Sequence, residues 1–289
     1  MVNLQDRVQP YIELMRLNRP IGILLLLWPT LSALWIASNG KPDLIVLTVF
    51  VLGVIIMRSA GCVINDYADR NVDGLVARTM NRPLITGALK PKQALTVFAG
   101  LGVVAFLLVL LLNSLTIWMS LVGLFLAATY PFMKRYTYLP QVYLGAAFGW
   151  AIPMAFAAQT NTVPAIAWLL FLANILWATA YDTFYAMADR KDDLLAGVKS
   201  TAILFGEDDK IIIGILQVSF LSVMLLVGGQ LEMSISYYTA ILIAAGLSVY
   251  QQRCTSEREP AQCMHAFLNN NWVGAVLFLG IIIHYAVDG

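Results

Sequence analysis

Residues 44–73 read LIVLTVFVLGVIIMRSAGCVINDYADRNVD, a long apolar run that ends in a cluster of acids. A helix needs about twenty apolar residues to cross a hydrocarbon core of ~30 Å. The run therefore predicts a transmembrane helix. The acids that follow it predict a polar site at one face of the membrane.

The rest of the chain has the same character. It contains 289 residues, of which 60% are hydrophobic and 12% are charged, whereas soluble domains carry roughly 25% charged residues. We predict an all-α polytopic membrane protein with a single transmembrane domain over residues 1–289. The formal net charge of +1 gives no sign of a nucleic-acid partner, and no protein partner can be inferred. Nine spans are predicted, starting near Ile21, Leu44, Ala94, Leu115, Val142, Ala165, Ile211, Tyr237 and Asn271.

The basic residues predict the orientation of these spans. With nine crossings, the N-terminus and the even-numbered connections share one face, and every Lys and Arg except Lys41 falls there. Because basic residues favour the cytoplasmic side, we expect a cytoplasmic N-terminus and Gly289 on the opposite side. Cys254, Cys263 and His265 are expected in the loop before the last span, and their spacing fits no common zinc pattern.

A second acidic segment resembles the first. The span starting near Ala165 ends in YDTFYAMADRKDD, residues 181–193, four spans after the segment at 65–73. Stretches of comparable length follow the two segments, NRPLITG at 81–87 and KSTAILFG at 199–206. This pattern indicates a weak internal duplication. We predict two weakly similar halves around a central cavity that is open to the cytoplasmic side.

The spacing of the acids predicts a metal site. Asn65, Asp69 and Asp73 are four residues apart and would share one face of a helix, and Asp189 and Asp193 repeat that spacing. Carboxylate and amide oxygens suit Mg²⁺ and are poor ligands for zinc or copper. We predict that these five residues bind Mg²⁺ and that the four aspartates among them are catalytic. The spacing leaves open whether Asp66, Asp182 and Asp192 also belong to this metal site.

The alternative is a solvated acidic helix end. Both segments lie at C-terminal ends of helices, where the helix dipole disfavours carboxylates, and charged groups near the bilayer are costly. A bound cation would remove both penalties. Nearby basic side chains would then bind diphosphate oxygens, although some of them serve only to orient the chain. The predicted diphosphate ligands are Arg70, Arg78, Arg82, Lys134 and Lys199.

The two motifs, Asn-Asp-x-x-Asp-x-x-x-Asp at 65–73 and Asp-x-x-x-Asp at 189–193, resemble the hallmarks of the UbiA superfamily of intramembrane aromatic prenyltransferases. Tyr-x-x-x-Lys at 130–134 adds to the resemblance, which extends over nearly the whole chain. Further stretches are similar to the bacterial members that prenylate 4-hydroxybenzoate. They are Arg-Pro-Ile-Gly at 19–22, Leu-Leu-Leu-Trp-Pro-Thr at 25–30 and Pro-Phe-Met-Lys-Arg-Tyr-Thr at 131–137.

The resemblance implies Mg²⁺-dependent transfer of a polyprenyl group, such as octaprenyl, from polyprenyl diphosphate to 4-hydroxybenzoate, ortho to the hydroxyl, in ubiquinone biosynthesis at the bacterial inner membrane. The membrane lipid would hold the polyprenyl tail. Alternatives are another acceptor (a naphthoate, a homogentisate or a haem precursor) or, from a different class, an ion or metal transporter.

Two further roles are expected within such a site. Arg135 would bind the carboxylate of the aromatic substrate through its guanidinium fork. The alternative for Arg135 is a purely topological role beside Lys134. Three tyrosines would stabilise an allylic cation through cation–π contacts, Tyr130, Tyr185 and Tyr67.

Overall fold

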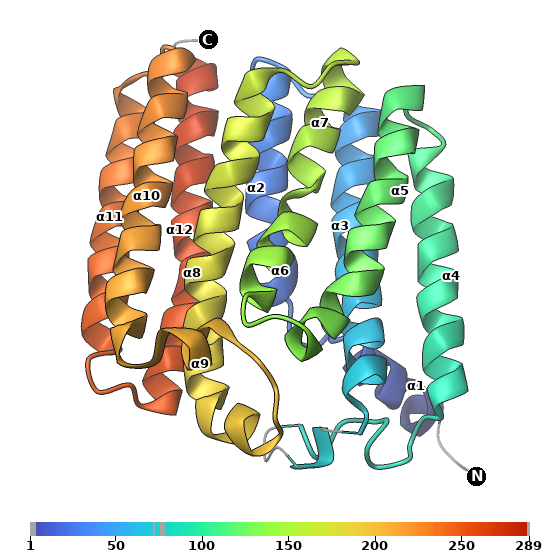
Figure 1. Cartoon of the computed structure of the whole chain (residues 1–289). Helices are drawn as coiled ribbons and strands as arrows, with labels where there is room; N and C mark the ends of the chain where they lie inside the picture. Colours follow the sequence, from blue (N-terminus) through green and yellow to red (C-terminus); the bar gives the residue numbers. More distant parts are fainter. Residues whose placement is uncertain (1–3, 72, 76–78, 288–289) are drawn as a thin grey trace.

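The computed structural model describes residues 4–71, 73–75 and 79–287. Within these ranges every regular element is a helix, and the long helices stand side by side in one bundle (Figure 1). The bundle begins at one end with α1 (Leu4–Leu14), and α12 (Pro260–Val287) finishes at the other. Opposite ends for the first and last helix agree with an odd number of crossings.

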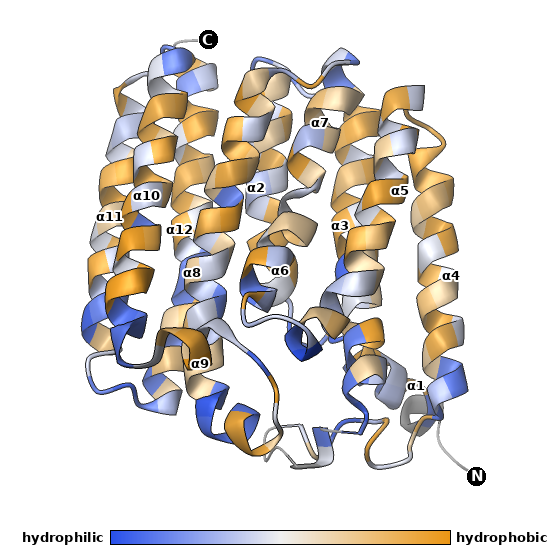
Figure 2. Ribbon diagram, in the orientation of Figure 1, coloured by the Kyte–Doolittle hydropathy of each residue, from blue (hydrophilic) through white to orange (hydrophobic). Residues whose placement is uncertain are grey.

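Seven helical segments in the described part of the chain are long and apolar enough to cross a membrane. Apolar residues dominate the middle of the bundle, and hydrophilic residues gather at its ends (Figure 2). The segments are α3 (Leu44–Asp69), α4 (Pro91–Val109), α5 (Ser114–Thr129) with η2 (Tyr130–Arg135), α6 (Pro140–Gly149) with α7 (Ala151–Thr160), α8 (Ala165–Leu195), α9 (Thr201–Phe205) with η3 (Gly206–Asp208) and α10 (Asp209–Gln230), and α12.

Two further helices lie within the bundle. The apolar helix α2 (Ile21–Ala37) packs against α7 and α12, and α11 (Ile235–Cys254) packs against α10 and α12. The chain is therefore a multi-pass membrane protein. At the end of the bundle where α1 and α9 lie, the connections include the short helix η1 (Asp73–Leu75). We call this the α9 end.

The break between α6 and α7 has a local cause. Proline lacks an N–H group, so Pro153 cannot donate to the carbonyl of Gly149, four residues earlier. The glycines before the break allow close packing on α8. A Cβ on Gly145 would lie 3.0 Å from Cα of Ile175, and one on Gly149 would lie 2.7 Å from Nδ2 of Asn174. The two glycines, four residues apart, therefore allow α6 to pack closely against α8 within the same chain.

The last helix corrects one prediction. It begins at Pro260 and not near Asn271, so Cys263 and His265 lie in a helix and not in a loop. Three successive asparagines at 269–271 interrupt the apolar run of this helix in the sequence. Each of them forms a hydrogen bond to a different helix. Asn269 accepts from Gln251 Nε2 of α11 at 3.0 Å. Asn270 and Asn271 accept from the indole N–H groups of Trp177 of α8 at 2.9 Å and Trp28 of α2 at 2.8 Å.

Candidate active site

One large cavity lies inside the bundle. It has a volume of about 990 Å³ and is lined by side chains of α2 to α8 and α12. Its polar part lies at the α9 end and contains the acidic motifs, and its other walls are apolar. Members of the apolar wall include Phe50, Val54, Phe106, Leu124, Phe148 and Met154. This combination suits a long apolar molecule with a charged head.

The first acidic motif is built on the end of α3. Asn65 and Asp69 lie on this helix and line the cavity, and Asp69 is only 2% exposed. Asp73 also lines the cavity, but it lies in η1, because α3 ends at Asp69. The prediction that all three residues share one helix face is therefore wrong for Asp73. A turn carries Asp73 back to the cavity, where Thr79 Oγ1 donates to its carbonyl oxygen at 2.7 Å.

The second motif lies on an unbroken helix, as its spacing predicts. Asp189 and Asp193 of α8 line the cavity together with Tyr185 and Asp182, which precede Asp189 by about one and two turns. Asp192 is not part of the lining. All five predicted metal ligands therefore line the same cavity, together with Asp66 and Asp182 from the uncertain set.

Basic side chains alternate with these acids. Lys134 forms an ion pair with Asp69. Arg82 pairs with Asp73 and, at 3.0 Å, with Asp66. Lys199 lines the cavity and donates to the carbonyl of Tyr136 at 3.3 Å. Arg78 lies outside the described residues. The predicted diphosphate ligands Arg82, Lys134 and Lys199 are therefore brought to the acids.

The burial of the first motif affects its electrostatics. Burial raises the pKa of Asp73, and the guanidinium of Arg82 opposes this rise only in part. Oδ1 of Asp69 is buried and has no hydrogen-bond partner among the described residues. A buried carboxylate oxygen without a partner is costly. The motif would therefore be stabilised by an additional cation.

The donor set fits magnesium. Among the described residues, no three Asp, Glu, His or Cys side chains are close enough to share one metal ion. Zinc sites in proteins usually need three or four such ligands, whereas Mg²⁺ is commonly held by one or two carboxylates together with waters and substrate phosphates. The oxygen-only donors around this cavity therefore suit Mg²⁺ bound together with a diphosphate.

Three predicted residues do not reach the cavity. Arg70 donates to the carbonyl of Tyr67 at 2.6 Å and lies over its ring at 4.3 Å, and neither side chain lines the cavity. Arg135 is exposed, donates to the carbonyl of Ala68 and is also absent from the lining. The guanidinium of Arg135 thus contacts the end of α3 from outside the cavity, and its expected role at a bound carboxylate stays a prediction.

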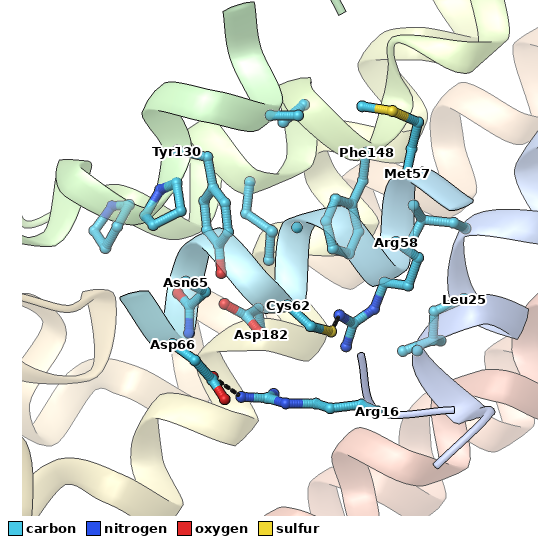
Figure 3. A pocket seen from close by; sticks show the side chains of 18 of the residues that line it. Arg16, Leu25, Met57, Arg58, Cys62, Asn65, Asp66, Tyr130, Phe148 and Asp182 are labelled. Atoms are coloured by element: carbon cyan, nitrogen blue, oxygen red, sulfur yellow. Dashed lines mark hydrogen bonds and ion pairs between the residues drawn. The ribbon is translucent and has the colours of Figure 1, made fainter. Parts of the chain in front are cut away.

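The sequence assigned neither of two arginines in the cavity to the site: Arg16 counted only as an orienting charge, and it stayed open whether Arg58 faces the cavity or the membrane edge. Arg16 pairs with Asp66 at 2.7 Å (Figure 3). Burial lowers the pKa of the guanidinium, but Asp66, Cys62 and Tyr185 together raise it above its usual value. Arg58 lies beside Cys62 and Leu25 in the cavity wall (Figure 3), and its Nε is buried without a hydrogen-bond partner. Arg58 precedes Asn65 by two helical turns. That spacing is the signal that could have identified it.

Tyr130 of η2 and Tyr185 of α8 both line the cavity. The hydroxyl of Tyr130 points towards Asn65 and Asp182 (Figure 3). The ring of Tyr185 packs edge-to-face on Phe267 of α12, with centroids 5.1 Å apart. The walls next to the acids are therefore partly aromatic.

Comparison with known proteins agrees with this arrangement. A model of the UbiA prenyltransferase family matches residues 26–280. A 4-hydroxybenzoate octaprenyltransferase of Nitrosococcus oceani is 62% identical over 282 residues, which are 98% of this chain and 99% of that protein. A protein of the same description from Aeromonas hydrophila is 59% identical, with coverage of 97% and 98%.

Solved structures share the fold. A UbiA homologue from Aeropyrum pernix K1 superposes with a TM-score of 0.79 at 24% identity, covering 91% of this chain and 97% of that one. A UbiA homologue from Archaeoglobus fulgidus, bound to GPP and Mg²⁺, gives a TM-score of 0.73 at 17% identity, with coverage of 96% and 100%. This chain belongs to the UbiA prenyltransferase family. It is a multi-pass membrane enzyme of the transferase class.

Proposed function

We propose that this enzyme transfers an octaprenyl group from octaprenyl diphosphate to 4-hydroxybenzoate, ortho to the hydroxyl, in ubiquinone biosynthesis. The observation that carries the proposal is one cavity that combines two acidic motifs, an arginine whose buried Nε has no hydrogen-bond partner among the described residues, and a long apolar wall. Relatives of 59% and 62% identity over nearly the full length are named 4-hydroxybenzoate octaprenyltransferase, which supports the transferred group and the acceptor.

The metal site is assigned to Asn65, Asp69, Asp73, Asp189 and Asp193. Their oxygens and the unpartnered Oδ1 of Asp69 support Mg²⁺ as the cofactor. The Mg²⁺ and GPP bound to the A. fulgidus homologue support it further. When bound, Mg²⁺ would neutralise the charge that develops on the leaving diphosphate. The four aspartates thereby act as catalytic residues.

The diphosphate is assigned to the basic residues at the acids. Lys134 and Arg82 already lie against Asp69, Asp66 and Asp73, and Lys199 lines the same part of the cavity. Charge-assisted hydrogen bonds from these cations would orient the diphosphate for cleavage of the bond between the allylic carbon and oxygen. Arg78 remains a proposed diphosphate ligand.

We assign the acceptor carboxylate to Arg58. Its guanidinium has an unpartnered Nε, and the apolar side chains of Phe148 and Leu25 lie close to it in the wall (Figure 3). A guanidinium fork matches a carboxylate in two hydrogen bonds. The phenol ring held in this way would attack the allylic carbon. Tyr130 and Tyr185 would stabilise its positive charge, and the apolar walls would exclude water.

The membrane supplies the first substrate. Each methylene favours an apolar environment over water by ~0.8 kcal/mol, so a polyprenyl tail stays in the bilayer and enters the apolar part of the cavity. We propose nine spans in a single domain over residues 1–289, comprising the seven segments above with α2 and α11. We also propose two weakly similar halves, whose acidic motifs lie at the ends of α3 and α8. The cavity would open to the cytoplasm at the α9 end, where the basic residues gather. The C-terminus would face the periplasm, with the protein in the inner membrane.

The test uses the full chain in lipid nanodiscs with labelled octaprenyl diphosphate and MgCl₂. Four acceptors are compared: 4-hydroxybenzoate, a naphthoate, a homogentisate and a haem precursor. We expect product with 4-hydroxybenzoate, none after chelation of Mg²⁺, and none from Asp69→Asn. A larger yield with another acceptor would assign the enzyme a different product. Yield that survives chelation would contradict the metal assignment.

A further inference from the structure

A second cluster of charges lies at the α9 end, outside the cavity. Asp209, the first residue of α10, is fully buried and accepts from two arginines. Arg190 of α8 contacts its Oδ2, and Arg258, between α11 and α12, places Nε 3.0 Å from Oδ1 and 3.2 Å from Oδ2. One carboxylate therefore connects three parts of the bundle.

The position of Asp209 is well supported. It lies in the first turn of a helix, where the dipole favours a negative charge, and the N–H of Lys210 donates to its Oδ1 at 2.6 Å. Arg258 also donates through Nη2 to the carbonyl of Glu207 at 2.6 Å. Its backbone adopts a left-handed φ of 54°, a conformation that is costly for a residue with a side chain. The structure holds Arg258 in this conformation next to Asp209.

Arg190 is the member of this cluster that relates to the active site. On α8 it stands between Asp189 and Asp193, yet both of these line the cavity and Arg190 does not. Successive helical residues point about 100° apart. Arg190 therefore shares the face of Met187, which packs against Ile213 of α10 in a core cluster. Its guanidinium is turned towards α10 by this packing and by Asp209.

Loss of Asp209 would free a positive charge beside the second acidic motif, on a side chain that is 24% exposed but whose Nε is buried. A guanidinium that loses such a partner is destabilised, and a neighbouring acid would attract it. Residues three apart on a helix are neighbours, which makes Asp193 the acid of α8 within reach of Arg190. An arginine at Asp193 would compete with a metal ion for the same carboxylate.

We propose that Asp209 is a positioning residue that holds the guanidinium of Arg190 away from Asp193 and so prevents this arginine from competing with the metal there. The inference rests on the proposed role of Asp189 and Asp193 in metal binding. It adds to that role a residue that touches neither metal nor substrate.

The test measures Mn²⁺ binding by the full chain in nanodiscs, from the EPR signal of the free ion. Asp209→Asn should weaken Mn²⁺ binding about tenfold, the lower end of what loss of a supporting partner costs a metal site. Arg190→Gln in the Asp209→Asn background should restore most of the affinity, because no guanidinium is left to compete. Arg190→Gln alone should bind Mn²⁺ like the wild type. Asp208→Asn, the same change at the exposed neighbouring position, is the matched control.

The outcomes distinguish failure of this inference from failure of the proposed metal site. Unchanged binding by Asp209→Asn would overturn the inference. So would a double variant that binds as weakly as Asp209→Asn, because Asp209 would then act through the general stability of α8. The charge-balanced double variant keeps the test informative if Asp209→Asn alone fails to fold. Wild-type affinity in an Asp189→Asn, Asp193→Asn protein would instead refute the proposed metal site.

Discussion

A methyl group on Gly22 offers the sharpest test of the acceptor site. Gly22 lies in α2, lines the cavity and contacts the guanidinium of Arg58. A Cβ at this position would lie 2.5 Å from both Nε and Nη2 of Arg58 and 2.9 Å from Cζ. Real Cβ atoms do not approach other atoms so closely, and thus Gly22→Ala must displace the guanidinium. The backbone of α2 needs no change, because alanine is the best helix former.

The magnitude follows from the bond that is disturbed. A hydrogen bond to a charged group contributes about 1.5–3 kcal/mol, and about 1.4 kcal/mol corresponds to a tenfold change in affinity. Complete loss in Arg58→Gln should therefore raise the KM for 4-hydroxybenzoate roughly 10- to 150-fold. The arginine in Gly22→Ala is displaced but still present, and we expect the lower end, about tenfold.

The assay is steady-state prenylation in nanodiscs, with each substrate varied at a saturating level of the other. The KM for octaprenyl diphosphate should stay near the wild-type value, because Arg58 is not assigned to the diphosphate. Gly100→Ala is the matched control, since no atom lies within 4 Å of its Cβ position and Gly100 does not line the cavity. An unchanged KM for 4-hydroxybenzoate in Gly22→Ala, or an equal rise for both substrates, would refute the assignment of Arg58.

Other changes test the remaining assignments. Arg135→Ala should leave both KM values near wild type, because the side chain lies outside the cavity; a selective rise for 4-hydroxybenzoate would restore the role expected from the sequence. Lys134→Gln should raise the KM for octaprenyl diphosphate more than that for 4-hydroxybenzoate, and the opposite ranking would remove Lys134 from the diphosphate site. Gly280→Val should lower the melting temperature measured by intrinsic fluorescence, since even a Cβ would lie 2.5 Å from Cβ of Ala240; a loss of about 1–3 kcal/mol is typical of such overpacking.

Much of the fold follows from hydrophobic runs, because a helix in lipid satisfies its own backbone and only needs apolar length. The start of α12 was not predicted, because asparagines interrupt its apolar run. Its asparagines look unfavourable in lipid, and their partners Trp28, Trp177 and Gln251 lie far away in the sequence. Sequence spacing cannot reveal hydrogen bonds between distant segments.

The active site was predictable where it is helical. Asp189 and Asp193 are confirmed on one face of α8, whereas Asp73 is brought back by a turn that helical periodicity cannot anticipate. The roles of residues adjacent in the sequence were harder to distinguish. Lys134 enters the cavity and Arg135 leaves it, because η2 points successive residues in different directions. Arg58 agrees with the membrane orientation like the other basic residues, and only its spacing from Asn65 indicated a position that faces the cavity.

The three asparagines of α12 have a consequence for biogenesis. The indole N–H groups of Trp28 and Trp177 and the amide of Gln251 are synthesised before their partners on the last helix. In hydrocarbon a polar group without a partner is costly, so helices inserted earlier keep unmet hydrogen bonds until α12 arrives. Adjacent asparagines point about 100° apart, which lets all three bonds form only at one rotation of the helix. Insertion of α12 therefore satisfies these polar groups only when the earlier helices are in place and α12 has the correct rotation.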